Sequence, residues 1–143
     1  MAKSIIQYAI TSFGIYDKWD DTAKLLPKIK AFTVNIPARI DIEFGFIINI
    51  KKGKGKKASF CIYHPNIPDE HGNVMPPFTG DIYIKNNDWH FYLGDTIWAP
   101  IHNKLGHWRM TIECENKTIA DKTFIIDEPD EILEATFWKR AGY

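Results

Sequence analysis

Five lysines fill most of the seven-residue segment from position 51 to position 57. They are Lys51, Lys52, Lys54, Lys56 and Lys57, with two glycines between them. Ammonium groups beside the uncovered backbone N–H groups of glycine can bind phosphate. The segment lacks the Ser or Thr that follows Gly-Lys in a phosphate-binding P-loop. Two interpretations stay open: a solvated hairpin tip, and a loop that binds polyanions or nucleic acid.

In the first interpretation the lysines are solvated or paired with the acidic run near the end of the chain. That run consists of Asp127, Glu128, Asp130, Glu131 and Glu134. Blocks of like charge are usually solvated. We therefore favour the first interpretation and keep polyanion binding through residues 51–57 as the alternative.

Histidine and cysteine side chains suggest metal binding or nucleophilic catalysis, and both suggestions are weak. His64, Asp69 and His71 are close in sequence, but the chain has no His-x-His, His-Glu-x-x-His or Cys-x-x-Cys motif. Cys61 and His64 could pair as nucleophile and base, yet residues three apart on one strand point to opposite faces. We expect no metal, no cofactor and no catalytic residue, and hence no enzyme.

The two cysteines also bear on the compartment. Cys114 is in phase with the apolar Trp108, whereas Cys61 is out of phase with Phe60 and Ile62, so a disulfide is not expected. The first residues lack the long apolar stretch of a secretory signal, and no apolar run is long enough to span a membrane. These observations predict free thiols, a cytoplasmic protein and no membrane partner.

Among the aromatic residues, Trp19 is the candidate for a binding contact. It stands in a polar segment, Tyr16-Asp17-Lys18-Trp19-Asp20-Asp21, so it is either an exposed anchor for a partner or a plug over one end of the fold. Trp108 and Phe91 lie at apolar positions of predicted strands, and we expect both in the core.

Composition limits the class of protein. The chain has 143 residues, 45% hydrophobic and 25% charged, with 18 basic and 18 acidic side chains. That length suits one domain with its own core and excludes wholesale disorder. The zero net charge removes any global signature of nucleic-acid or membrane binding.

Hydrophobicity with a period of two indicates β-strands. From Ala38 to Ile50 the even positions are all apolar, and the odd ones include Arg39, Asp41, Glu43 and Asn49, which predicts a long strand with one wet face. The alternation returns over 108–114 and 120–126, and weaker candidates cover 6–10, 31–34, 59–64, 81–85 and 89–93. About seven to eight short strands without crossover helices predict an all-β antiparallel sandwich or barrel over residues 1–127.

The segment 128–143 changes to helical chemistry. Pro129 suits a first helical turn, and Lys139 and Arg140 suit a last one. Leu133 and Phe137 would lie on one apolar face of this short C-terminal helical tail. We expect that face to pack on the sandwich itself or on another chain, either a second copy in a homodimer or a different protein.

Several segments together resemble a bacterial family of domains of unknown function, number 3859. The resemblance covers about residues 5 to 127 and is carried by these segments: Ile36-Pro37-Ala38, Glu43-Phe44-Gly45, His64-Pro65, Gly106-His107-Trp108-Arg109-Met110 and Ile119-Ala120-Asp121-Lys122-Thr123-Phe124. It implies an immunoglobulin-like β-sandwich and brings no catalytic residues. The expected function is a non-enzymatic interaction or adaptor module that presents loops or a sheet edge to a protein partner.

Overall fold

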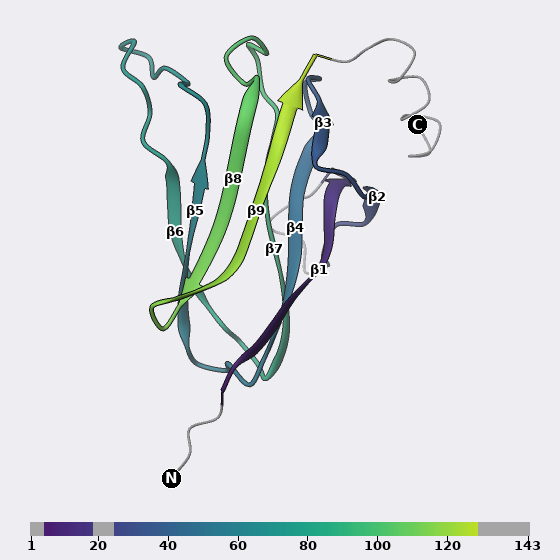
Figure 1. The fold of residues 1–143 in the computed structure, drawn as a ribbon, viewed down its shortest axis with the longest axis vertical. Helices are drawn as coiled ribbons and strands as arrows, with labels where there is room; N and C mark the ends of the chain where they lie inside the picture. Colours follow the sequence, from purple (N-terminus) through teal and green to yellow (C-terminus); the bar gives the residue numbers. More distant parts are fainter. Residues whose placement is uncertain (1–4, 19–24, 129–143) are drawn as a thin grey trace.

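The computed structural model describes residues 5–18 and 25–128, which form nine β-strands (Figure 1). The strands are β1 (Gln7–Tyr16), β2 (Ile29–Ala31), β3 (Asn35–Pro37), β4 (Glu43–Lys51), β5 (Lys57–Tyr63), β6 (Phe78–Tyr83), β7 (Asp88–Thr96), β8 (Gly106–Cys114) and β9 (Lys117–Asp127). The predicted all-β architecture is confirmed, but the expected count of seven to eight strands is too low. Two three-residue strands are too short to leave a periodic pattern.

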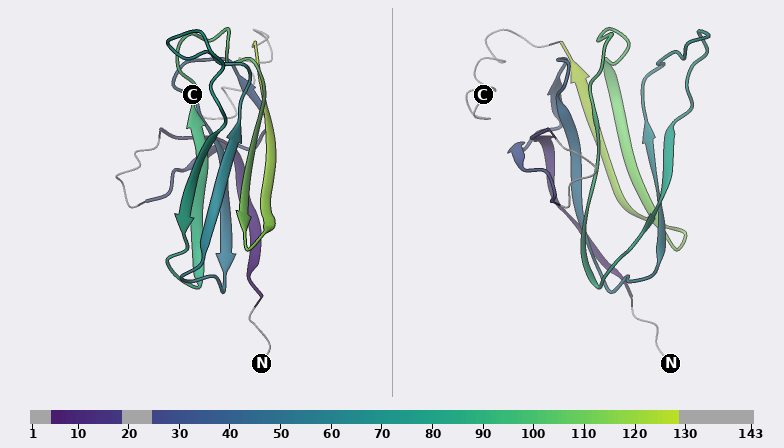
Figure 2. Two further views of the ribbon diagram at one scale, coloured as in Figure 1. Left: turned by 90° about the vertical axis from the view of Figure 1, so that its left-hand side faces the viewer. Right: turned by 180° about the vertical axis from the view of Figure 1, so that it is seen from behind.

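The strands form two sheets that pack face to face (Figure 2). Sheet A has the order β2-β1-β4-β7, and sheet B has the order β3-β9-β8-β5-β6. Every pair is antiparallel except β3 with β9, which run parallel. The 51–57 hairpin and the turn between β8 and β9 lie at one end of the sandwich, and the loop of residues 64–77 projects from the other (Figure 1).

The core consists of the alternating apolar residues of both sheets. Phe44 of β4 meets Trp108 and Phe124 of the opposite sheet edge-on, at ring-centroid distances of 5.5 and 5.6 Å. Trp108 is 1% exposed, as predicted, and its indole N–H donates to the Lys104 carbonyl oxygen at 2.8 Å. Phe91 is half-buried and packs against the same core.

The long strand predicted over residues 38–50 starts later than its pattern indicates. Asp41 has a φ of 72°, which no strand residue adopts, and the strand begins at Glu43. Ile40, an apolar position of the pattern, is therefore exposed. The prediction of one wet face is also wrong for the first half of this strand, where Glu43 and Ile47 are buried.

The candidate strand over residues 31–34 is not one strand. The chain leaves β2 in sheet A and enters β3 in sheet B, and on the way it passes directly over Gly14 of β1. A Cβ at Gly14 would lie 1.9 Å from the Ala31 carbonyl oxygen, so only glycine permits this crossing.

The tight hairpin predicted near Asn116 is confirmed. Glu115 and Asn116 both have positive φ, 53° and 63°, and Cys114 pairs with Lys117 across the turn. Two successive positive φ values suit the right-handed twist of the flanking strands. The two turn residues stand one position earlier than the Asn116-Lys117 pair that the sequence suggested.

Three predicted interaction residues and the tail lie outside the described residues. These are Trp19, Leu133 and Phe137, together with the helix expected over 129–141. The described part of the chain contains no helix, and in it no helix meets the length and apolarity that crossing a membrane requires. The strands run from Gln7 to Asp127, within the predicted sandwich range of 1–127.

Candidate functional site

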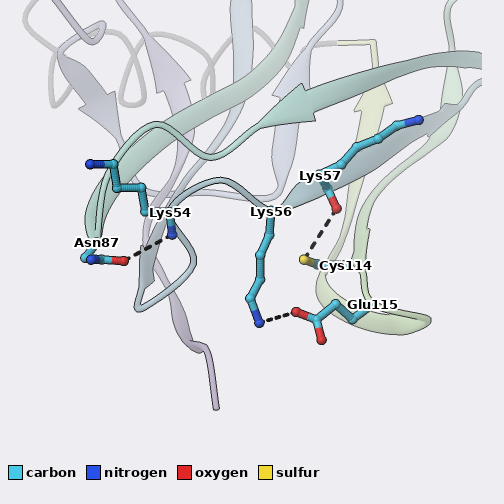
Figure 3. Close-up of polar contacts among 6 residues, drawn as sticks. All are labelled: Lys54, Lys56, Lys57, Asn87, Cys114 and Glu115. Atoms are coloured by element: carbon cyan, nitrogen blue, oxygen red, sulfur yellow. Dashed lines mark hydrogen bonds and ion pairs between the residues drawn. The ribbon is translucent and has the colours of Figure 1, made fainter. Parts of the chain in front are cut away.

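The lysine hairpin joins β4 to β5, with Lys51 closing one strand and Lys57 opening the next. Two of its ammonium groups are held by carboxylates of neighbouring strands and turns. Lys56 Nζ pairs with Glu115 Oε1 in the β8–β9 turn (Figure 3), and Lys57 Nζ lies 3.3 Å from Asp81 Oδ2 of β6. Both partners differ from the acidic run that starts at Asp127; Asp130, Glu131 and Glu134 of that run lie outside the described residues, so the expected pairing with it stays a prediction.

The main chain of the hairpin is anchored rather than being a free tip. Asn87 Oδ1 accepts a hydrogen bond from the Lys54 N–H at 3.1 Å, and Cys114 Sγ donates to the Lys57 carbonyl oxygen at 3.6 Å (Figure 3). Gly53 is buried against the side chains of Ile50 and Ile84. Packing from three sides holds this turn in place.

Three lysines of the hairpin remain available. Lys51, Lys52 and Lys54 are exposed, and within the described ranges no carboxylate forms an ion pair with them. Their charges are screened only by solvent and salt, so their contribution to binding would depend on ionic strength.

The outer face of sheet B carries a hollow of about 380 Å³. Its lining comes from β5, β6 and β8: Ser59, Phe60, Cys61, Tyr63, Thr79, Gly80, Asp81, Thr111 and Glu113. The cross-strand pairs Cys61–Thr79, Ser59–Asp81 and Cys61–Thr111 bring these side chains together. No pattern along one strand predicts such a hollow, because the lining comes from three strands and only their register joins it.

Cys61 lies in this hollow as a free thiol, and Cys114 is a free thiol on the core side of the same sheet. The predicted difference in phase is therefore confirmed. A hydrogen bond with Cys61 raises the pKa of Tyr63. Beside the hollow, Arg109 Nε and Nη2 donate to the Asp121 carboxylate at 2.9 and 2.7 Å, which lowers the pKa of Asp121.

The outer face of sheet A holds a buried carboxyl group. Glu43 is 5% exposed; its Oε2 lies 2.5 Å from the Tyr92 hydroxyl, and its Oε1 accepts a 2.7 Å hydrogen bond from Thr96. Burial raises the pKa of Glu43 and raises the pKa of Tyr16, which packs beside Tyr92, to about 12. Groups with shifted pKa values often mark functional sites, although structural networks shift them too.

The residues considered for metal binding are His64, Asp69 and His71, and each of them has structural contacts within its own loop or strand end. His64 stacks on Phe78 at 4.6 Å, and its ring nitrogens lie within hydrogen-bond distance of two backbone carbonyl oxygens. Asp69 Oδ1 accepts hydrogen bonds from the main-chain N–H groups of His71 and Asn73, which shapes the loop of residues 64–77. The described residues contain no group of three side chains placed to hold a metal ion.

Two of three comparisons with known proteins give a match. An immunoglobulin-like protein from Pseudomonas aeruginosa superposes with a TM-score of 0.68 at 14% identity, covering 89% of this chain and all of that one. This likeness shows the immunoglobulin-like fold. No curated protein sequence matches the chain. A family model described as "Domain of unknown function (DUF3859)" matches residues 4–126, so the resemblance seen in the sequence is confirmed and the chain belongs to the DUF3859 family.

Proposed function

We propose that this protein is a non-enzymatic binding module that adds an extended segment of a protein partner to the β6 edge of sheet B. The observation that carries the proposal is the position of β6: among the described strands only β5 pairs with it, and the hollow lies beside it. Strand addition to an open edge is a common mode of peptide recognition, in which main-chain hydrogen bonds provide affinity and pockets provide specificity.

The hydrogen-bond pattern indicates which groups of β6 are free to pair. The Ile84 N–H, just after β6, donates to the Lys56 carbonyl oxygen at 3.0 Å. Since main-chain groups alternate between the two sides of an antiparallel strand, those of Thr79, Asp81 and Tyr83 face the open edge. The β5–β6 pairing has no bulge that would twist the edge away from a partner.

Two features favour this edge over the alternatives. The hollow adjoins β6, which distinguishes it from β7, the other long edge strand. Asp81 points to the outer face near the middle of β6, so two copies that paired symmetrically about this residue would place like charges opposite each other. A different protein is therefore a better partner for this edge than a second copy.

The non-enzymatic part of the proposal rests on how the reactive side chains are separated. Cys61 faces the outer hollow, whereas His64 stacks against Phe78 and Trp108. A nucleophile needs a base within hydrogen-bond reach. We propose the cytoplasm as the compartment, because both described cysteines are free thiols.

A proline substitution tests strand addition directly. In Thr79→Pro the lost N–H faces away from β5, so the variant should fold while one edge donor disappears. Peptides selected from a random phage-displayed library on the wild-type protein should bind Thr79→Pro at least tenfold more weakly. Thr79→Val, which keeps the N–H, should bind them like the wild type. Equal binding to Thr79→Pro would contradict the proposal, provided its circular dichroism spectrum is unchanged.

Polyanion binding through the lysine hairpin is the second candidate function. The observation in its favour is that Lys51, Lys52 and Lys54 are exposed without a carboxylate partner in the described ranges. Replacing these three with Gln should flatten the salt slope of heparin binding by roughly 0.9 for each lost phosphate-type contact. Replacing Lys56 and Lys57, which are already paired, should change it less. A wild-type protein that does not bind heparin or DNA at low salt would exclude this function.

A further inference from the structure

We infer that the hollow on the outer face of sheet B receives a basic side chain, a Lys or Arg of the segment added along β6. This inference rests on the proposed strand addition and names the chemistry of the segment that would be recognised. The hollow lies on the same face of sheet B as the side chains of Thr79 and Asp81. An outward-pointing residue of a strand added beside β6 can therefore reach over β6 into the hollow.

The charges of the hollow favour a cation. Its lining contains the carboxylates of Asp81 and Glu113 and no basic side chain. Lys57 neutralises Asp81 from the rim, whereas no basic group of the described ranges forms an ion pair with Glu113. Arg109 is held by two hydrogen bonds to Asp121. An anion would be repelled by the Glu113 carboxylate, whereas a basic side chain would form an ion pair with it.

The hydroxyl groups of the lining provide the second, independent observation. Thr111 is 8% exposed, occupies an outward position of β8 and lines the hollow; its hydroxyl has no hydrogen-bond partner among the described residues and is reached by solvent from the hollow. Ser59 and Thr79 line the same hollow with further hydroxyl groups. An ammonium or guanidinium group carries several N–H donors and no acceptor, so it suits a lining of hydroxyl and carboxylate oxygens.

The hollow can be tested without the partner by using a small cation. In ¹H–¹⁵N spectra, n-butylammonium should cause saturable shifts at the backbone amides of Thr79, Thr111 and Glu113. 1-Butanol, which has the same stem without the charge, should cause much smaller shifts. Glu113→Gln should weaken butylammonium binding at least threefold, and Glu70→Gln, which removes a carboxylate outside the lining, should leave it unchanged. Equal shifts from the two ligands, or wild-type binding by Glu113→Gln, would overturn the inference.

Peptides separate this inference from the strand addition on which it rests. Selected peptides should contain Lys or Arg at one outward position. Replacing that residue with norleucine should weaken the binding of the peptide to the wild-type protein at least tenfold. The same replacement should weaken its binding to the Glu113→Gln variant much less. Peptides that bind the β6 edge equally well with norleucine would leave strand addition standing and contradict the basic side chain. If butylammonium binds but the selected peptides bind Thr79→Pro as tightly as the wild type, the strand addition is wrong and the cation-binding hollow stands.

Discussion

The outer faces of the two sheets carry the same kinds of side chain and differ in whether those side chains are already satisfied. On sheet A, the Glu43 carboxyl group is buried and contacts the hydroxyls of Tyr92 and Thr96. On sheet B, the Glu113 carboxylate lines an open hollow, and the Thr111 hydroxyl beside it has no partner among the described residues. The Glu43 carboxyl group is therefore already paired within the protein, whereas the Glu113 and Thr111 side chains can still bind a ligand.

The closed face depends on a row of glycines. Gly14, Gly45 and Gly94 pair with one another across β1, β4 and β7, and no side chain rises from the sheet there. The Tyr92 ring lies over Gly94, where a Cβ would come within 2.0 Å of the Tyr92 hydroxyl oxygen. Gly94 therefore leaves room for the Tyr92 ring, whose hydroxyl contacts the buried Glu43 on a face that the sequence marks as wet.

Burial and hydrogen bonds shift the pKa of the Glu43 carboxyl group in opposite directions. Tyr92 has one hydroxyl hydrogen and two acceptors within reach, Glu43 Oε2 at 2.5 Å and the Phe44 carbonyl oxygen at 3.2 Å. Tyr92 donates to Glu43 Oε2 and Thr96 donates to Glu43 Oε1, and both hydrogen bonds lower the pKa of Glu43. Burial is the largest effect and raises the pKa of Glu43. Sheet A thus buries its carboxyl group, whereas the Glu113 carboxyl group of sheet B lines an open hollow.

The largest expected effect comes from filling the glycine row. Gly94→Ala places a methyl group against the Tyr92 hydroxyl and 2.5 Å from the Phe44 carbonyl oxygen, so it should lower the free energy of unfolding by about 3 kcal/mol. Urea denaturation measures this change. In the double variant Tyr92→Phe/Gly94→Ala the loss should be smaller than the sum of the two single losses, because the methyl group meets the hydroxyl. Strict additivity would show that Tyr92 does not close this face.

A matched pair of hydroxyl removals should separate the two faces. Tyr92→Phe takes a hydrogen-bond partner from a buried carboxyl group and should cost about 1 to 2 kcal/mol. Thr111→Val removes a hydroxyl without a described partner and should change stability by no more than about 0.5 kcal/mol. Chemical denaturation of both variants against the wild type provides the comparison. A cost for Thr111→Val equal to that for Tyr92→Phe would mean that the hollow is as satisfied as the closed face.

The smallest effect is a pH dependence of stability. A carboxyl group with a raised pKa in the folded state keeps its proton when the unfolded chain has lost it, so its stabilising contribution is full below its ordinary pKa of 4.5 and falls as the pH rises through the folded value. Glu43→Gln should remove part of this decline, which is at most about 1.4 kcal/mol per pH unit for one group.

Two other carboxyl groups allow an internal check of that sign. Burial also raises the pKa of Asp95, so part of the decline should remain in Glu43→Gln. Asp121 has a lowered pKa because of Arg109, so its contribution is lost only in acid, as the pH falls through that lowered value. Thermal unfolding from pH 3 to pH 8 resolves both limbs. A decline of equal slope in the wild type and in Glu43→Gln would show that Glu43 is ionised when folded.

Much of the fold was already determined by local sequence. Strict alternation over 108–114 predicted β8 with its buried Trp108, since the period of a strand fixes which side chains share a face. The same phase argument placed Cys61 and Cys114 on opposite faces, and the positive-φ tolerance of Asn predicted the turn near Asn116. These features depend on neighbours in the chain, which one sequence contains in full.

Only the tertiary structure decided which polar groups are buried and which are free. Glu43 occupies a position that alternation marks as solvent-facing, and it is buried because Tyr16 and Tyr92 pack over it from two other strands. Lys56 and Lys57 are paired by Glu115 and Asp81, which stand 59 and 24 positions further along the chain. The hollow at Thr111 likewise arises from the register of three strands. Such contacts join residues far apart in sequence, and no local pattern contains the register that brings them together.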